Sequence, residues 1–150
     1  MVQYLPATHD LVAQFRMRGA DVSEVALTCP NMDPLDVTHL SVEGSDAAAV
    51  AVAPDGEVLS VFGLAYSSDS PTVAYIWMLS SEGITRHAKE ALRHGRRVIE
   101  WARRRAGSRL LCNYIARDNT SARAYIQRLG ATIVHNPVGS FDFFFFPPNV

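Results

Sequence analysis

The stretch that decides the fold runs over residues 72–116 and reads TVAYIWMLSSEGITRHAKEALRHGRRVIEWARRRAGSRLLCNYIA. Residues 72–79 are rich in β-branched and aromatic side chains, which favour a strand. From Ile84 to Ala102, apolar or small residues recur at helical spacing and basic residues fill the other positions, which predicts an amphipathic helix roughly 30 Å long. Leu110–Ala116 predicts a second strand. A strand, a long helix and another strand in this order predict a parallel pair joined by a right-handed crossover.

Shorter elements are predicted on both sides of this unit. The turn Pro54-Asp55-Gly56-Glu57 joins two strand-like segments and predicts a β-hairpin. The other predicted elements are a strand at residues 2–7, helices following Thr8 and at 22–27, 35–42 and 119–129, and a final strand pair at 131–135 and 141–146. The sequence therefore predicts a single α/β (α+β) domain over residues 1–150, with a central mixed sheet flanked by helices.

The composition is that of a globular domain with a substantial core. The 150 residues are 48% apolar and 19% charged, which argues against a disordered or fibrous chain. No apolar run is long enough for a membrane span, and the first residues do not resemble a secretory signal. Cys29 and Cys112 lie far apart and fit neither a disulfide framework nor a zinc spacing. We therefore expect a protein of a reducing interior that neither crosses a membrane nor is secreted.

Charge is distributed very unevenly along the chain. Residues 1–82 carry two basic and eleven acidic side chains, whereas residues 83–150 carry twelve basic and four acidic ones. The basic half could meet a phosphate-bearing cofactor, a nucleic acid or an acidic partner. The arginine-rich helix lacks interleaved aromatic residues, and the acidic half would repel a nucleic-acid backbone, so we do not expect nucleic-acid binding.

The order of elements resembles the Gcn5-related N-acetyltransferase (GNAT) fold, and one segment resembles that family's motif B. The segment has Asn119, Ala122, the pair Tyr125-Ile126, and Leu129-Gly130. The resemblance implies acetyl-CoA as a cofactor, lying between two splayed strands, here residues 73–79 and 110–116. It also implies that the turn at residues 80–86 holds the pyrophosphate at the start of the following helix, where unpaired N–H groups attract anions.

The resemblance also implies roles for individual residues. The cofactor-binding candidates are Leu79, Gly83, Ile84, Thr85, Arg86 and Asn119. Tyr125 is the candidate general acid, and Tyr114 is a substitute for it. Tyr125 lies one position early, a rotation of about 100° around the helix, so the alternative is a core position. Tyr114 could equally be a half-buried strand residue, and Asn119 is first of all a helix N-cap.

The predicted phosphate turn departs from the family pattern. It has a single glycine, Gly83, with Ser80 where the family has arginine or glutamine and Thr85 where it has glycine or alanine. Glu82 adds a negative charge beside the expected anion. These departures predict a degenerate acetyl-CoA site. Glu82 and Glu57 are candidate bases, with solvated surface carboxylates as the alternative.

A second resemblance is closer in sequence. It is carried by the segments 76–81, 85–87, 92–96 and 113–115, with Trp101 and Asp118-Asn119. These are similar to the GNAT-like internal virion protein A family of short-tailed bacteriophages, whose members are associated with assembly of the virion's internal core. This implies a role in virion assembly or host interaction, with virion or host proteins as partners, in the host cytoplasm or the virion. The alternative is an active acetyl-CoA-dependent N-acetyltransferase with an unknown amine acceptor.

Two further features have both a structural and a functional interpretation. His87 and His94 are seven residues apart without an evident third ligand, so we predict no metal site. Residues 143–146 are four consecutive phenylalanines, and a strand made of them must be covered on both faces. We predict a fully buried strand inserted into the sheet. The alternative is a homo-oligomer or assembly contact that covers one face.

Overall fold

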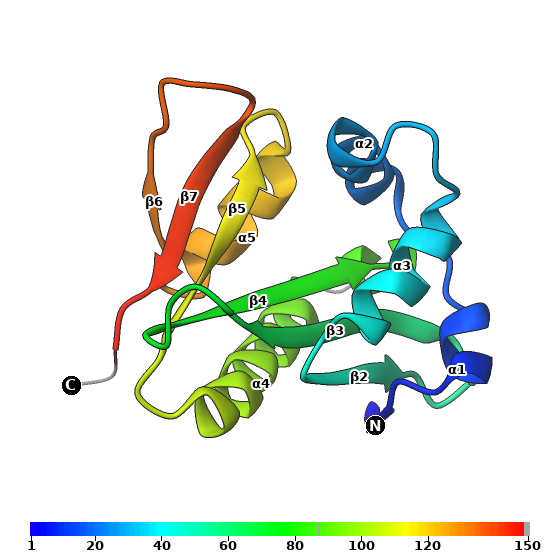
Figure 1. Cartoon of the computed structure of the whole chain (residues 1–150). Helices are drawn as coiled ribbons and strands as arrows, with labels where there is room; N and C mark the ends of the chain where they lie inside the picture. The colour runs from blue at the N-terminus through cyan, green and yellow to red at the C-terminus, as the bar shows by residue number, and fades with distance from the viewer. Residues whose placement is uncertain (87, 149–150) are drawn as a thin grey trace.

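A mixed sheet organises the fold (Figure 1). Residues 1–86 and 88–148 are described by the computed structural model, and in them seven strands follow the order β1-β2-β3-β4-β5-β7-β6. Their bounds are β1 Gln3–Pro6, β2 Ala47–Val52, β3 Val58–Tyr66, β4 Val73–Ser80, β5 Leu110–Ala116, β6 Thr132–Val134 and β7 Phe141–Phe146. Neighbouring strands are antiparallel except β4 and β5, which are parallel. The expected mixed α/β fold and the parallel pair are therefore confirmed.

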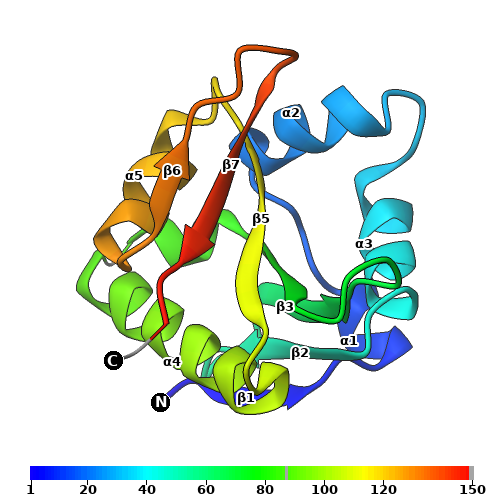
Figure 2. The ribbon, with the colours of Figure 1, turned by 60° about the vertical axis from the view of Figure 1, so that its left-hand side comes forward.

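Helices cover both faces of the sheet (Figures 1 and 2). They are α1 His9–Ala13, α2 Gly19–Thr28, α3 Pro34–Glu43, the 3₁₀ helix η1 Glu82–Arg86, α4 Ala88–Ala106 and α5 Thr120–Arg128. Because side chains alternate along a strand, each face has its own core. On one face Phe62 and Ile76 pack with residues of α4 and α5. On the other, Val50 and Val61 pack with residues of α1 and α3.

The long helix begins later than its apolar pattern predicts. Residues 82–86 form the 3₁₀ helix η1, in which the Ile84 N–H donates to the Ser81 carbonyl at 3.3 Å. Regular α-helix then runs for 19 residues from Ala88. The apolar spacing of Ile84 fits either kind of turn, so it does not fix where the α-helix starts.

The second helix is longer than predicted. The prediction was residues 22–27, whereas the helix runs from Gly19 to Thr28. Asp21 is the buried residue of this helix, so no apolar stripe marks it in the sequence. Polar contacts to the ends of β4 and β5, described below, hold it in place.

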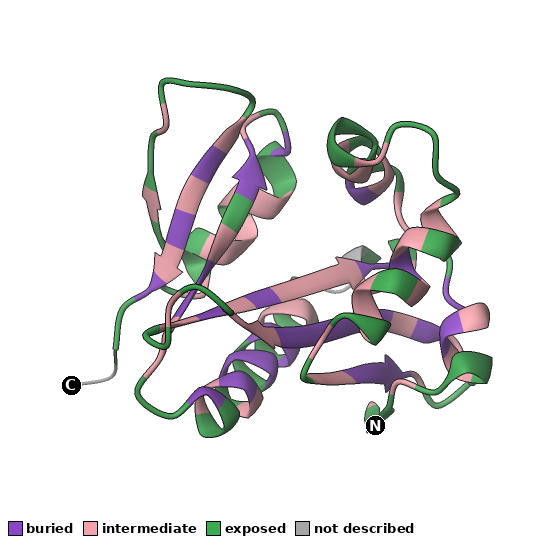
Figure 3. Cartoon of the chain, viewed as in Figure 1, coloured by how far each residue is buried: buried purple, intermediate pink, exposed green. Residues whose placement is uncertain are grey.

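The phenylalanine strand is inserted between β5 and β6, as expected, but it is not buried on both faces (Figure 3). Phe144 and Phe146 belong to the core, whereas Phe143 and Phe145 on the other face are half-buried. The prediction of a fully buried strand is therefore wrong for that face. A homo-oligomer contact stays a prediction, and Phe143 and Phe145 would carry it.

A buried carboxylate ties α5 to this strand. Asp142 receives the Asn136 N–H at 2.9 Å and the Arg123 guanidinium at 2.7 Å. Arg117 lies 3.3 Å from the same carboxylate. The backbone donor, followed by the two guanidinium groups, holds the pKa of Asp142 well below its usual range against the effect of burial. The ion pairs fix α5 relative to β7.

A second buried polar group joins α4 to the sheet. The ring of His94 is hydrogen-bonded on both sides, to Tyr4 Oη at 2.8 Å and to Ser60 Oγ at 2.8 Å. His94 and Ser60 are buried. Desolvation, followed by the charge of Arg97, lowers the pKa of His94 to about 4. The imidazole is therefore neutral at physiological pH, with one nitrogen donating and the other accepting.

No helix within residues 1–86 and 88–148 combines the length and apolar character required to cross a membrane.

Candidate functional site

The two parallel strands separate soon after they meet. They pair over three positions, from Val73 with Leu110 to Tyr75 with Cys112, and then diverge (Figure 1). At the start of the gap, Asn113 Nδ2 donates to the Ile76 carbonyl at 2.8 Å, so that carbonyl points toward β5. The predicted splayed strands are therefore present.

The gap exposes backbone groups of β4. In a strand paired antiparallel on one side, the N–H and C=O of every second residue point to the other side. Ile76 points away from β3, and so does Ser80, whose N–H donates to Asp21 Oδ2 at 2.9 Å. Met78 lies midway between them and opposite Phe62 in the register. Its N–H and C=O therefore point into the gap.

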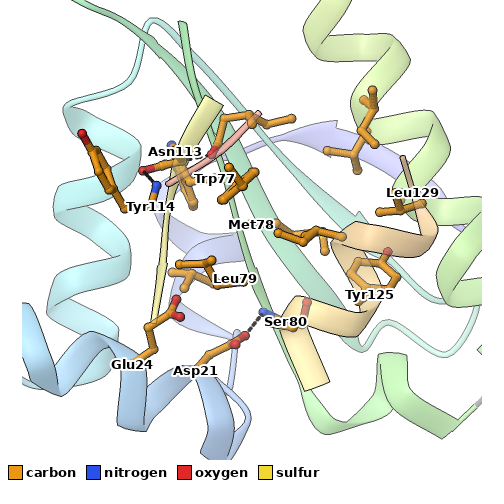
Figure 4. Close-up of a pocket in the computed structure, with 18 of the residues that line it drawn as sticks. Asp21, Glu24, Trp77, Met78, Leu79, Ser80, Asn113, Tyr114, Tyr125 and Leu129 are labelled. Carbon is orange, nitrogen blue, oxygen red and sulfur yellow. Dashed lines mark hydrogen bonds between the residues drawn. The ribbon is translucent and has the colours of Figure 1, made fainter. Parts of the chain in front are cut away.

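A cavity of about 180 Å³ occupies the gap (Figure 4). It is lined by side chains of β4, β5, α2, α4, α5 and β7, most of them apolar. Among the predicted site residues, Leu79, Tyr114 and Tyr125 line it. The structure thus brings both candidate acids and one cofactor-binding candidate to a single cleft.

Three charged residues at the N-cap and in the first turns of α2 also line the cleft, and none of them was predicted to be a site residue. They are Arg18, Asp21 and Glu24, spaced three apart on one face of the helix. Arg18 Nε lies 3.1 Å from Asp21 Oδ2, and the Arg18 N–H donates to the Ser80 carbonyl at 2.8 Å. The three-residue spacing of charges was a usable signal. It could not show that this face meets the sheet.

Glu24 joins α2 to β5 and α5. Its Oε1 accepts the Ala116 N–H at 2.7 Å and the Asn119 amide at 3.4 Å. Burial raises the pKa of Glu24, and these two hydrogen bonds partly oppose that shift. The result is a carboxyl group at the wall of the cleft whose second oxygen, Oε2, takes part in neither bond.

Tyr125 packs tightly against α4. Its hydroxyl donates to the Ala91 carbonyl at 2.6 Å. A Cβ placed on Gly95 would clash with the Tyr125 hydroxyl oxygen, so a larger residue there would require the Tyr125 and Leu129 side chains to shift. Burial is the largest cause that raises the pKa of Tyr125 above its usual range, so the hydroxyl stays protonated. Its role as a general acid stays a prediction.

Tyr114 and Asn119 occupy different surroundings. Tyr114 is 53% exposed on β5 and meets Phe143 edge-on, with ring centroids 5.5 Å apart. Asn119 is the N-cap of α5, and its side chain accepts the Ala122 N–H at 3.3 Å, which confirms the capping interpretation. Through its bond to Glu24 it also supports the cleft wall.

The predicted phosphate turn is flanked by carboxylates. A Cβ on Gly83 would lie 2.4 Å from Glu57 Oε1, and Glu82 Oε1 accepts the Gly19 N–H at 3.0 Å. Both candidate bases thus lie at the turn. Arg86 is exposed at the end of η1. The side chain of Thr85 and all of His87 lie outside the described residues.

A second pocket lies beside this turn, between the beginning of α4 and α5. Arg18, Ile84, Ser121, Tyr125 and Arg128 are among its lining residues. Ile84, which was predicted to bind the cofactor, therefore lines this second pocket together with residues of α5. The guanidinium groups of Arg18 and Arg128 supply the kind of donor that an anion requires.

In residues 1–86 and 88–148, no group of three His, Cys, Asp or Glu side chains is arranged to hold a metal ion.

Solved structures of N-acetyltransferases share this fold. The GCN5-related N-acetyltransferase from Kribbella flavida is 19% identical, with a TM-score of 0.68 and 98% of each chain covered. Spermidine N-acetyltransferase from Vibrio cholerae, in complex with CoA and spermine, is 8% identical, with a TM-score of 0.73 and 97% of this chain and 94% of that chain covered. Ribosomal-protein-alanine N-acetyltransferase from Brucella melitensis is 15% identical, with a TM-score of 0.62, covering 95% of this chain and 96% of that one.

Neither the protein-family models nor the curated protein sequences match this chain. The structural similarities show that the chain has the GNAT fold. They give no support to the bacteriophage virion family, so that resemblance stays a prediction.

Proposed function

We propose that this protein is an acyl-CoA-dependent N-acyltransferase that acts on an amine. The observation that carries the proposal is the gap between β4 and β5, which leaves the Met78 N–H and C=O pointing into an apolar cleft. An unpaired strand edge inside a cleft is a binding site for an extended chain of amides. Among the structural neighbours, the Vibrio cholerae enzyme was solved with CoA.

The residues along the cleft fit an acyl-CoA. The open edge of β4 offers backbone groups to the amides of a pantetheine arm, and Leu79, Val98 and Ile126 offer apolar walls. In the second pocket, beside the turn at residues 80–86, Arg18 and Arg128 can hold a diphosphate. Arg18 lines both the cleft and the second pocket, so the two binding regions are continuous.

When bound, acyl-CoA would supply a thioester: a C–N bond forms to the amine, the C–S bond breaks, and the departing thiolate takes up the proton that the attacking nitrogen loses. The Met78 N–H would donate a hydrogen bond to the thioester carbonyl oxygen, on which negative charge develops. The apolar walls exclude water, which strengthens that hydrogen bond.

Calorimetric titration of acetyl-CoA into the purified protein tests the proposal. We expect saturable binding with a Kd tighter than about 100 μM, which corresponds to roughly −5.5 kcal/mol. Acetyl transfer to a panel of amines, followed by mass spectrometry, is the second readout. An absence of both binding at millimolar acetyl-CoA and transfer would overturn it.

The carboxylates at the turn are expected to weaken this binding. Replacing Glu57, which faces Gly83, by glutamine removes a negative charge beside the expected diphosphate. We expect the Glu57→Gln variant to bind CoA about threefold more tightly at low salt, with a smaller gain at high salt, because salt screens the repulsion. Glu43→Gln, at the exposed end of α3, is the matched control. Equal affinities for all three proteins would show that the turn does not face the diphosphate.

The same turn favours a second candidate function. A virion assembly or host-interaction protein could keep the fold with a degenerate acetyl-CoA site, and the carboxylates of Glu57 and Glu82 beside Gly83 are the observation in its favour. The half-buried Phe143 and Phe145 would then supply a contact for a partner protein. Saturable acetyl-CoA binding together with acetyl transfer would exclude a degenerate site.

A further inference from the structure

A groove outside the cleft shares one of its walls. It lies between α2 and the strands β5 and β7 and is lined by Glu24, Val25, Thr28, Asn113, Tyr114 and Phe141. Glu24, Asn113 and Tyr114 line the cleft as well, so the groove and the cleft meet at these three residues. The groove has a volume of about 460 Å³, which is in the range of small-molecule sites.

The chemistry of the groove is simple. Of the six lining side chains only Glu24 carries a charge, and Val25, Tyr114 and Phe141 are the large apolar or aromatic ones. The hydrogen bonds from Ala116 and Asn119 hold Glu24 Oε1, which orients the carboxylate and leaves Oε2 for a ligand. Figure 4 shows the Glu24 side chain projecting from α2 toward Leu79, while Tyr125 lies on the other side of the cleft.

We propose that this α2–β5 groove binds the acyl acceptor, a primary monoamine with an apolar body, and that Glu24 receives the ammonium group and its proton. This rests on the proposed function and names its acceptor. The carboxylate pairs with the ammonium, and the rings of Tyr114 and Phe141 cover the apolar body. Because the groove has one carboxylate, it can pair with one ammonium group. The further ammonium groups of a polyamine would find no anionic partner among the groove's lining residues, which disfavours polyamines.

Glu24 also makes the amine reactive. An ammonium ion has no lone pair for attack, so one N–H bond must break and leave its electron pair on nitrogen. The proton forms an O–H bond at Glu24 Oε2. Burial raises the pKa of this carboxyl group, which brings it closer to that of the amine and eases the transfer.

Two measurements on the full chain test the proposal. 2-Phenylethylamine is titrated calorimetrically into protein with and without saturating CoA, and its acetylation by acetyl-CoA is followed by mass spectrometry. We expect it to bind at least tenfold more tightly than spermidine or the uncharged 2-phenylethanol. In the Glu24→Gln variant we expect binding about tenfold weaker and kcat/KM about 10²-fold lower, as for loss of a general base.

The variants are chosen to preserve the fold. Glutamine keeps an oxygen that can accept the Ala116 N–H. Thr28→Arg places a positive charge at the exposed rim of the groove and should weaken amine binding, whereas Ala26→Arg on the exposed face of α2 is the matched control. Wild-type amine binding in both Glu24→Gln and Thr28→Arg, or a preference for spermidine, would overturn the proposal.

The outcomes separate this proposal from the proposed function. Acetylation of other amines without any dependence on Glu24 would support the acyltransferase function but contradict the proposal that the α2–β5 groove binds the acceptor. Glu24-dependent binding of 2-phenylethylamine, with neither acetyl-CoA binding nor acetyl transfer to any amine, would support the amine site and contradict the acyltransferase function.

Discussion

Replacing Met78 by proline is expected to lower kcat for acyl transfer by about 10²- to 10³-fold, the usual cost of losing one donor to a developing oxyanion. Proline has no N–H, and the Met78 N–H is the β4 donor that points into the middle of the cleft. Because this N–H points away from β3, its removal costs no hydrogen bond of the β3–β4 ladder. The sheet should therefore tolerate the change, as edge strands do.

Two further variants isolate the effect of the N–H. Met78→Ala also loses the methionine side chain but keeps the N–H, so it should retain most of kcat. Leu79→Pro removes an N–H that points toward β3 and should destabilise the fold, which circular dichroism and thermal unfolding would show. If folded Met78→Pro turned over acetyl-CoA as fast as Met78→Ala, the Met78 N–H would not be the oxyanion donor.

Lowering the pH from 7.5 to 5 is expected to cost about 2 kcal/mol of folding free energy through His94 alone. The unfolded chain has an ordinary imidazole pKa of about 6.5, whereas burial lowers the pKa of His94 in the folded chain to about 4. Between these values the unfolded state binds a proton that the folded state does not. The contribution of His94 is therefore complete above the unfolded pKa and is lost as the pH falls toward the folded one.

Urea unfolding at pH 7.5, 6.5, 5.5 and 5.0 measures this dependence, with His94→Gln as the comparison. The variant loses hydrogen bonds to Tyr4 and Ser60 and should be less stable at every pH, but its stability should change less between pH 7.5 and 5. Glu24, whose raised pKa acts in the opposite direction, is present in both proteins and cancels. Parallel pH profiles for the two proteins would contradict the assignment to His94.

The sequence predicted those parts of the fold whose signal is local and apolar. Strands β3, β4 and β5 are apolar runs bounded by turn residues, and α4 has an apolar face at helical spacing, so local composition and spacing identify them. The splayed pair followed from the order of these elements and the resemblance. Helix α2 was only partly predicted, because its buried side is polar and its partners, Ser80 and Ala116, are 59 and 92 residues away.

The candidate site divides in the same way. Leu79, Tyr114 and Tyr125 were predicted and line the cleft, because they lie on elements that the sequence identified. Arg18, Asp21 and Glu24 were missed, because nothing in a single sequence shows that this face of α2 meets the open end of two strands. The close approach of Tyr125 to Gly95 could not be predicted from the sequence either, because it depends on the angle at which α4 and α5 cross.

The brief pairing of β4 with β5 has a consequence for the mechanics of the molecule. Strands β1 to β4 form one hydrogen-bonded ladder and β5, β7 and β6 another, and three residue pairs join the two. Helix α4 packs on both ladders. A ligand with a chain of amides, bound in the gap, would contact both ladders and would occupy the place of an additional strand between them. The stiffness of the whole sheet would then depend on the ligand concentration, because the gap between β4 and β5 is bridged by the ligand and not by the protein.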